Sequence, residues 1–308
     1  MSQTQVPATC QCGCAKNTTM LPMTGLGLGF DLSNVPGLIQ PGPEGAHLVT
    51  RNGQLVWEMP EACEYPAVPD NLYVATDGDD ANDGLKPEKP FKTIQAAVDS
   101  TRQYPQVGKA ITINVATGEY TGNVQFHFNV HYKNLFLLGD ENEMPVINGR
   151  VEAKYAGQAR VKNIHCKDAA YCFHSSHYSR LQLEDCRATG EYALNAHYLA
   201  TLIVVGTFAI DGSAGVQRGM YASRNGMIVF WEGCEVSAKG SFSLELCVCF
   251  LEGSIYFATG CVFTDNGVTG RRYRIMAGSC LSISGGSATF IPGTVDGTVD
   301  SNSLFVGV

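Results

Sequence analysis

Charge is scarce in this chain. Charged residues make up 16% of its 308 residues, well below the roughly 25% of ordinary globular domains. The 21 Lys and Arg residues are outnumbered by 29 Asp and Glu, and the basic residues form no cluster. We therefore expect no nucleic-acid partner, because neutralising a phosphate backbone requires grouped Lys and Arg. A surface so poor in charge suits burial in an assembly or exposure to sugars.

Long apolar runs are also missing. The longest one, Leu246 to Leu251, has the length of a strand and not the ~18 residues of a membrane span. The first residues, MSQTQVPATCQCGC, lack the basic start and apolar stretch of a signal peptide. We expect no membrane insertion and synthesis in a cytoplasm, where thiols stay reduced.

A repeated unit is present in the second half. Six short apolar runs end in a small residue, and the ends are spaced 20, 21, 27, 27 and 26 residues apart. A period in this range is typical of a solenoid, in which each repeat buries its apolar face against its neighbours. The six closing positions are Cys166, Cys186, Thr207, Cys234, Cys261 and Ser287. We interpret the four cysteines among them as small buried residues stacked from turn to turn.

Residues 1–70 differ from the rest, because Gly and Pro are dense there and no helical period is sustained. One local element is predicted, a β-hairpin of residues 47–50 and 54–58 around Asn52-Gly53. Such an arm builds no core of its own, so we expect it to attach the protein to a larger assembly. It carries the triplet Cys10, Cys12 and Cys14, with Cys63 further on. Three interpretations stay open for these thiols: a metal site, disulfides between subunits, or a free thiol-bearing arm.

Residues 72–103 give the clearest local signal. A strand at 72–75 is followed by the acidic turn 77–84, and Phe91, Ile94 and Val98 then recur at helical spacing. We predict a short helix near 91–102, with Thr93 as its cap, that covers the open end of the solenoid. The acidic turn lacks the calcium-loop pattern, and we interpret it as a solvated turn.

The segment Leu72 to Asp99, which contains Asn82-Asp83-Gly84 and PFKTIQAAV, resembles the lead-in to pectate-lyase-like right-handed parallel β-helix proteins, most of all bacteriophage tail fibres and tailspikes. The match covers about 30 residues. It implies an all-β right-handed parallel β-helix over 71–290, with a capping helix and an extended arm, and a closing strand over 291–308. It also implies a homotrimer, a location in the virion tail, and contacts of residues 1–70 with other tail or baseplate proteins.

The sequence favours binding over catalysis. Polysaccharide-cleaving enzymes of this fold need paired carboxylates in a groove, and Glu184, Asp185, Glu232 and Glu252 form no pair repeated from turn to turn. We therefore predict no catalytic residue, no metal ion and no cofactor. A lyase or glycoside hydrolase of this fold remains the alternative, as does a baseplate or head-decoration protein without a receptor role.

Histidine and tyrosine recur just before two closing positions. The pairs 177–178 and 197–198 lie nine and ten residues before Cys186 and Thr207, so successive turns should place them one above the other, about 4.8 Å apart. Such a column suits sugars, because ring faces pack on C–H surfaces and polar tips form hydrogen bonds. A purely structural stack is the other interpretation. The predicted contacts to host-surface polysaccharide are Tyr171, His174, His177, Tyr178, His197 and Tyr198.

Overall fold

The computed structural model describes residues 47–51, 54–58, 67–104, 109–127, 135–155, 158–212 and 217–307. The chain divides into two units, Met1–Tyr65 and Pro66–Val308. In the first unit β1 (His47–Arg51) and β2 (Gln54–Glu58) pair antiparallel, as the sequence predicts. Cys10, Cys12, Cys14 and Cys63 lie outside the described residues, and so does most of the predicted arm.

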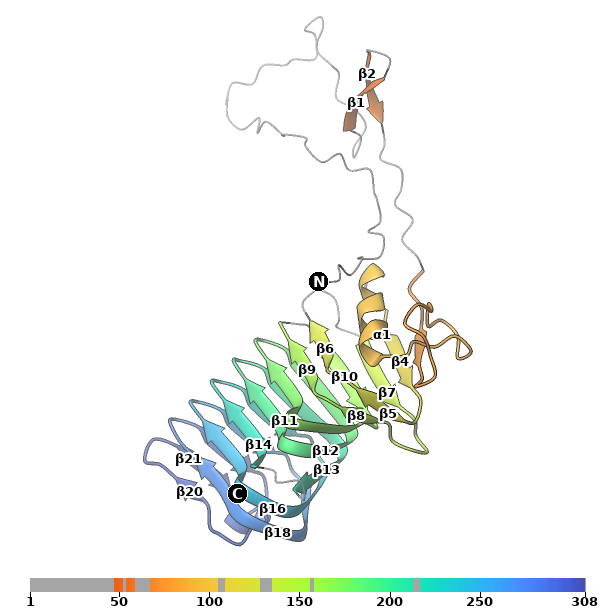
Figure 1. Cartoon of the computed structure of the whole chain (residues 1–308). Helices are drawn as coiled ribbons and strands as arrows, with labels where there is room; N and C mark the ends of the chain where they lie inside the picture. Colours follow the sequence, from red (N-terminus) through yellow and green to blue (C-terminus); the bar gives the residue numbers. More distant parts are fainter. Residues whose placement is uncertain are drawn as a thin grey trace, which may run out of the picture. The chain divides into compact units, whose positions relative to one another are not determined.

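The second unit is a parallel β-solenoid of about seven turns, which confirms the predicted fold class. Its strands stack one behind another along the body (Figure 1). They form three faces, and a full turn contributes one strand segment to each. The first face holds β3 (Asn71–Val74), β4 (Ile111–Val115), β7 (Leu135–Gly139), β10 (Gln158–Lys162), the first residues of β12 (Arg180–His197) and β13 (Thr201–Gly212), then β15 (Met227–Phe230), β17 (Ser254–Phe257), β19 (Cys280–Ile283) and β21 (Leu304–Gly307).

Several long strands bend from the second face into the third. The second face holds β5 (Glu119–Thr121), β8 (Val146–Asn148) and parts of β11 (His165–Ser176), β12, β13, β16 (Glu235–Phe250) and β18 (Val262–Ile275). The third face holds β6 (Val124–His127), β9 (Val151–Lys154), β14 (Arg218–Ser223), β20 (Thr298–Val299) and the last residues of β11, β12, β16 and β18.

The core consists of columns of apolar side chains, because parallel pairing in register puts like positions of successive turns in contact. Alternate residues of the first-face strands point inward, as the burial of β4 and β7 shows. Phe230 and Phe257 illustrate the result: both are buried, and their rings stack 4.4 Å apart at 7°. The column to which they belong is Leu137, Val161, Leu183, Val204, Phe230, Phe257 and Ile283.

The predicted single column of closing residues is wrong in detail. Cys166 pairs with Ala188, and Cys186 pairs with Phe208. Only Cys234 and Cys261 adjoin in register, since Val262 N donates to Cys234 O. The register shifts after Glu184, where the chain forms a bulge. The solenoid is therefore aligned by its apolar strands and not by its cysteines.

A helix covers the N-terminal end of the solenoid, as predicted. It consists of α1 (Ile94–Ser100) and a 3₁₀ turn, η2 (Thr101–Gln103), and Thr93 caps it by accepting from Ala96 N. The Asp80 carboxylate accepts from the backbone of Thr93 at 2.8 Å and from its hydroxyl at 2.8 Å, so the acidic turn helps to hold this helix start. Figure 1 shows α1 beside β6 and β4.

The solenoid continues past residue 291. A 3₁₀ turn, η4 (Ala288–Phe290), is followed by β20, which pairs with β18, and by β21, which pairs with β19. These strands extend the stack to Gly307, close to the end of the chain.

Two-residue turns connect the third face to the first on successive coils. Both residues of each turn have positive φ, for example 54° and 63° at His177-Tyr178 and 56° and 60° at Tyr198-Leu199. The left-handed region costs a non-Gly residue roughly 1–2 kcal/mol, so these turns require compensation. Hydrogen bonds from one turn to the next provide it: Tyr178 N donates to Tyr198 O, and Leu199 N to Arg224 O, both at 3.1 Å. We call this edge of the solenoid the stacked turns; they comprise 177–178, 198–199, 224–225, 251–252 and 277–278.

Candidate functional site

Five of the six predicted contact residues form a ring cluster over the later parts of β11 and β12 and the turns after them. The sixth, Tyr178, adjoins the cluster through its backbone N, which donates to Tyr198 O. The rings of His177 and Tyr198 stack with centroids 4.6 Å apart, and those of His174 and His197 lie 4.7 Å apart. The predicted register is wrong by one residue, because Ser176 and not His177 pairs with His197. His177 therefore faces Tyr198, and the column alternates histidine with tyrosine.

Neighbouring turns extend this cluster. Tyr155 lies 4.3 Å from the ring of His177, Tyr192 lies 5.0 Å from Tyr171, and Tyr221 lies 5.8 Å from Tyr192. The rings span four consecutive coils of the third face and the adjoining turns. We call the set the ring surface; it comprises Tyr155, Tyr171, His174, His177, Tyr178, Tyr192, His197, Tyr198 and Tyr221.

The ring surface is open to solvent along the stacked turns. Tyr178 is 77% exposed, Tyr155 46% and Tyr198 36%. Rings on the third face itself are less accessible, and His174 is buried. Exposed rings above a packed layer of rings give an edge that is rigid and accessible, which is the arrangement that stacking on a ligand requires.

A buried carboxylate supports the rings from below. Glu152 Oε1 lies 3.1 Å from His174 Nδ1, and Glu152 Oε2 accepts from Gln125 Nε2 at 3.3 Å. Burial raises the pKa of Glu152, but the hydrogen bond and charge of His174, together with Arg150 and Lys154, outweigh it and lower the pKa to about 2. Glu152 is therefore ionised over the whole working range of pH, and it orients the His174 ring.

The His174 ring in turn positions the His197 ring, because their Nε2 atoms lie 2.7 Å apart. One of these two ring nitrogens donates to the other, and the tautomers of the two rings decide which one does. Burial, and then the charges of His174, His177 and Arg224, lower the pKa of His197 to about 4. Burial, and then the charge of Lys154, also lowers the pKa of His177. At neutral pH both imidazoles are uncharged polar rings.

Arginine holds the tyrosines of the third face. Arg218 Nη1 donates to the Tyr192 hydroxyl at 2.7 Å, and Arg218 Nε lies 3.2 Å from Glu245 Oε2. The guanidinium also lies over the rings of Tyr192 and Tyr221, at 5.6 and 5.4 Å. This part of the ring surface is fixed by charge-assisted contacts.

Sequence reasoning missed Tyr155, Tyr192, Tyr221, Glu152 and Arg224. Arg224 lies ten residues before Cys234, the same offset as His197 from Thr207, so carrying that offset to the next coil would have found it. Glu152 and Tyr192 give no such signal. Strand register on the third face brings Glu152 to His174 and Tyr192 to Tyr171, and the bulge in β11 hides that register from spacing.

Three of the four acidic residues considered for catalysis, all except Glu232, have structural partners among the described residues. Glu184 pairs with Lys162 at 2.8 Å and Arg160 at 3.3 Å. Asp185 accepts from Thr207 N at 3.0 Å, and Glu252 accepts from Asn225 Nδ2 at 3.0 Å. These contacts join one coil to the next, which gives the three carboxylates a role in the stack.

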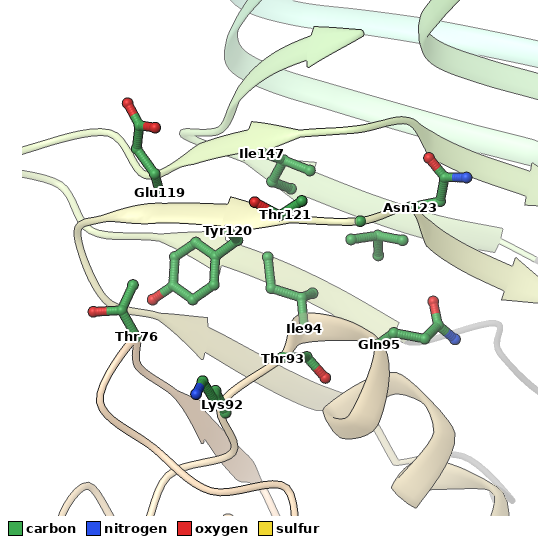
Figure 2. A pocket seen from close by; sticks show the side chains of 12 residues that line it. Thr76, Lys92, Thr93, Ile94, Gln95, Glu119, Tyr120, Thr121, Asn123 and Ile147 are labelled. Carbon is green, nitrogen blue, oxygen red and sulfur yellow. The ribbon is translucent and has the colours of Figure 1, made fainter. Parts of the chain in front are cut away.

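A groove of about 380 Å³ lies between α1 and the second face. Figure 2 shows Ile94 beside the ring of Tyr120, with Thr76 at one end and Gln95 toward the other. Gln95 is engaged with the edge strand β6, since its Oε1 accepts from Gln125 N at 2.7 Å. The Tyr120 hydroxyl donates to Ala116 O at 2.8 Å. The polar groups of Gln95 and Tyr120 in this groove thus form hydrogen bonds within the protein. We do not assign a ligand to this groove.

No group of His, Cys, Asp and Glu suited to a metal ion occurs among the described residues. In the same part of the chain, no helix combines the length and apolarity that a membrane crossing needs. Comparison with family models, with curated proteins and with solved structures finds no match to this chain. The ring surface is therefore the basis for assigning a function.

Proposed function

We propose that this protein is a tail fibre or tailspike of a bacteriophage that binds host-surface glycan on its ring surface. The observation that carries the proposal is the contact network of histidine and tyrosine rings over four coils, with Tyr155, Tyr178 and Tyr198 exposed at its edge. Sugars present C–H faces and hydroxyls together, and side chains with an apolar ring and a polar tip match both.

The fold suits this role. A solenoid presents equivalent side chains at a spacing of about 4.8 Å along its axis, so an extended polymer would meet the same kind of contact on each coil. The proposal places residues 1–70 at the tail or baseplate and the solenoid in a homotrimer. Synthesis takes place in the host cytoplasm and the working location is the virion.

Binding to purified host capsule or O-antigen tests the proposal, measured by calorimetry on the full chain. The variant Tyr178→Ala with Tyr198→Ala is expected to weaken binding about tenfold or more, because two ring contacts of roughly 0.5–1.5 kcal/mol each are lost. The matched control is Trp231→Ala with Tyr256→Ala, which removes two rings of comparable exposure, 55% and 39%, from the first face. Equal loss in both variants would contradict the proposal.

Two further experiments separate the alternatives. Incubation with the same polysaccharides, followed by assay for reducing ends or unsaturated uronates, is expected to show no product; release of product would establish the enzymatic alternative. Deletion of residues 1–70 is expected to abolish incorporation into particles while the trimer stays intact by light scattering. Unchanged incorporation would refute the attachment role and favour a different place in the virion.

A further inference from the structure

Two cations bracket the exposed rings. Lys154 Nζ lies 5.4 Å from the centre of the Tyr155 ring, and Arg224 Cζ lies 4.7 Å from the centre of the Tyr198 ring. Strand register places the two cations three coils apart, since Lys154 pairs with Ser176, Ser176 with His197, and His197 with Ser223. The order along the solenoid axis is therefore Lys154 with Tyr155, then His177, then Tyr198, then Arg224.

Arg224 Nη1 donates to the Tyr198 hydroxyl, and the other donors of Arg224 and those of Lys154 are available to a ligand. Within the described part of the chain, Lys154 and Arg224 belong to none of the ion pairs, whereas nearby Arg150 and Arg218 pair with Glu152 and Glu245. Glu152 is 4% exposed and is enclosed by its own partners. The edge of the ring surface thus carries two cations outside the ion pairs, with Glu152 as a buried carboxylate near Lys154, in a protein whose net charge is -8.

The next coil limits this positive stretch. Glu252 follows Arg224 by one coil along the stacked turns, and Asn225 Nδ2 holds its carboxylate at 3.0 Å. An anionic ligand would be attracted up to Arg224 and repelled beyond it. The span from Lys154 to Arg224 covers three coil spacings, which amounts to about 14 Å at roughly 4.8 Å each.

One buried acceptor beside the rings also lacks a partner. Asn195 is 3% exposed, and its Oδ1 makes no hydrogen bond with any described residue. It lies between His174 and Tyr221 in the strand register of the third face. Because this oxygen is closed to solvent, a buried water would supply its missing donor, and the atom is not counted among the ligand contacts.

We infer that the ligand is an acidic glycan that runs along the solenoid axis over the stacked turns. Its oxyanions bind Lys154 and Arg224, and its sugar faces pack on Tyr155, His177 and Tyr198. The inference deepens the proposed function and rests on it, because it names the ligand class and the direction of the chain at the same surface. Neutral His177 and His197 contribute polar ring atoms without adding charge.

Calorimetry with three probes tests the inference on the full chain: oligogalacturonate, dextran sulfate and neutral dextran. Oligogalacturonate is expected to bind, and to bind less tightly as salt rises, because exposed charge pairs are screened. If dextran sulfate binds as well, the inferred oxyanion site stands, and the protein recognises negative charge and not the carboxylate group in particular. Equal binding of neutral dextran would overturn the inference and leave the proposed function standing. If none of the three probes binds, the inference fails, and host capsule then decides the proposed function separately.

Substitutions of Lys154 and Arg224 test whether these two residues bind the oxyanions of the ligand. Lys154→Gln and Arg224→Gln are each expected to weaken oligogalacturonate binding about three- to tenfold, which is the range of a hydrogen-bonded charge contact at an exposed site. Arg224→Lys keeps the charge and should recover part of the loss, and unchanged melting would show that the fold is intact. The control Lys89→Gln changes an exposed lysine in the turn before α1. If it weakens binding as much as Lys154→Gln, the inferred location is wrong.

Discussion

The left-handed turns allow a quantitative test with a matched pair of leucines. Leu199 lies in a stacked turn with φ of 60° and is 52% exposed. Leu244 lies in β16, is 41% exposed, and has no positive φ. Their backbone amides make similar hydrogen bonds of 3.1 Å, to Arg224 O and to Gln217 O. Replacement of each leucine by glycine therefore removes similar side-chain contacts and loosens the unfolded chain equally.

The difference between the two variants isolates the cost of the left-handed backbone. Leu244→Gly should destabilise the protein by the lost contacts and by glycine's entropy cost of roughly 0.5–1 kcal/mol. Leu199→Gly incurs the same losses but regains the roughly 1–2 kcal/mol of left-handed strain. We expect Leu199→Gly to be the more stable variant by about 1–2 kcal/mol. At about 2–4 °C per kcal/mol for a domain of this size, this is a clear separation in melting temperature.

Thermal unfolding followed by circular dichroism measures this difference, with both variants at one protein concentration and one scan rate. If Leu199→Gly melts at or below Leu244→Gly, the stacked turns are not strained and the positive φ values there carry no energetic meaning. That result would also weaken the argument that hydrogen bonds from turn to turn hold this edge rigid.

The other predictions concern the core, the cap, the histidines and the thiols. Phe257→Ala should cost about 3–5 kcal/mol in unfolding free energy, because the stacked ring is buried, and a loss below 1 kcal/mol in a denaturant titration would argue against the stack. Gln95→Ala should expose the edge of β6 and promote association detectable by light scattering; an unchanged monodisperse sample would show that the cap does not need this contact. Stability should fall as pH drops from about 6.5 toward 4, because the folded pKa of His197 lies near 4 and the unfolded chain binds the proton first; the His197→Gln variant should show a shallower loss of melting temperature, and an identical slope would refute the assignment. Burial raises the pKa of Cys186 to about 12, so alkylation mapped by mass spectrometry should label the partly exposed Cys261 and Cys280 before Cys186, and the reverse order would contradict the described packing.

Sequence predicts the architecture well because the solenoid signal is distributed over many apolar residues. The capping helix is predictable to within a few residues, since Ile94 and Val98 lie on its inner side and Thr93 caps its start. The predicted start at residue 91 is too early, because Phe91 forms a β-bridge with Val74. The alignment of coils is predicted less accurately. Small closing residues such as Cys186 carry no register information, because a bulge at Asp185 moves the following residues relative to the next coil.

The sequence predicts only those site residues that are neighbours along the chain. His177 and Tyr198 stand out because histidine-tyrosine pairs recur before the closing positions. Glu152 reaches His174 from the preceding coil, 22 residues earlier in the chain, and only strand register shows that they touch. The cations Lys154 and Arg224 are ordinary surface residues in the sequence, and they become a pair when the coils are stacked.

Hydrogen–deuterium exchange with and without bound host glycan tests the central claim most directly, because it reports where the ligand lies without any substitution. The account predicts protection confined to the ring surface and its stacked turns, including residues 152–155, 174–178, 195–199 and 221–225. Protection of the groove beside α1, of the first face, or of residues 1–70 alone would contradict it.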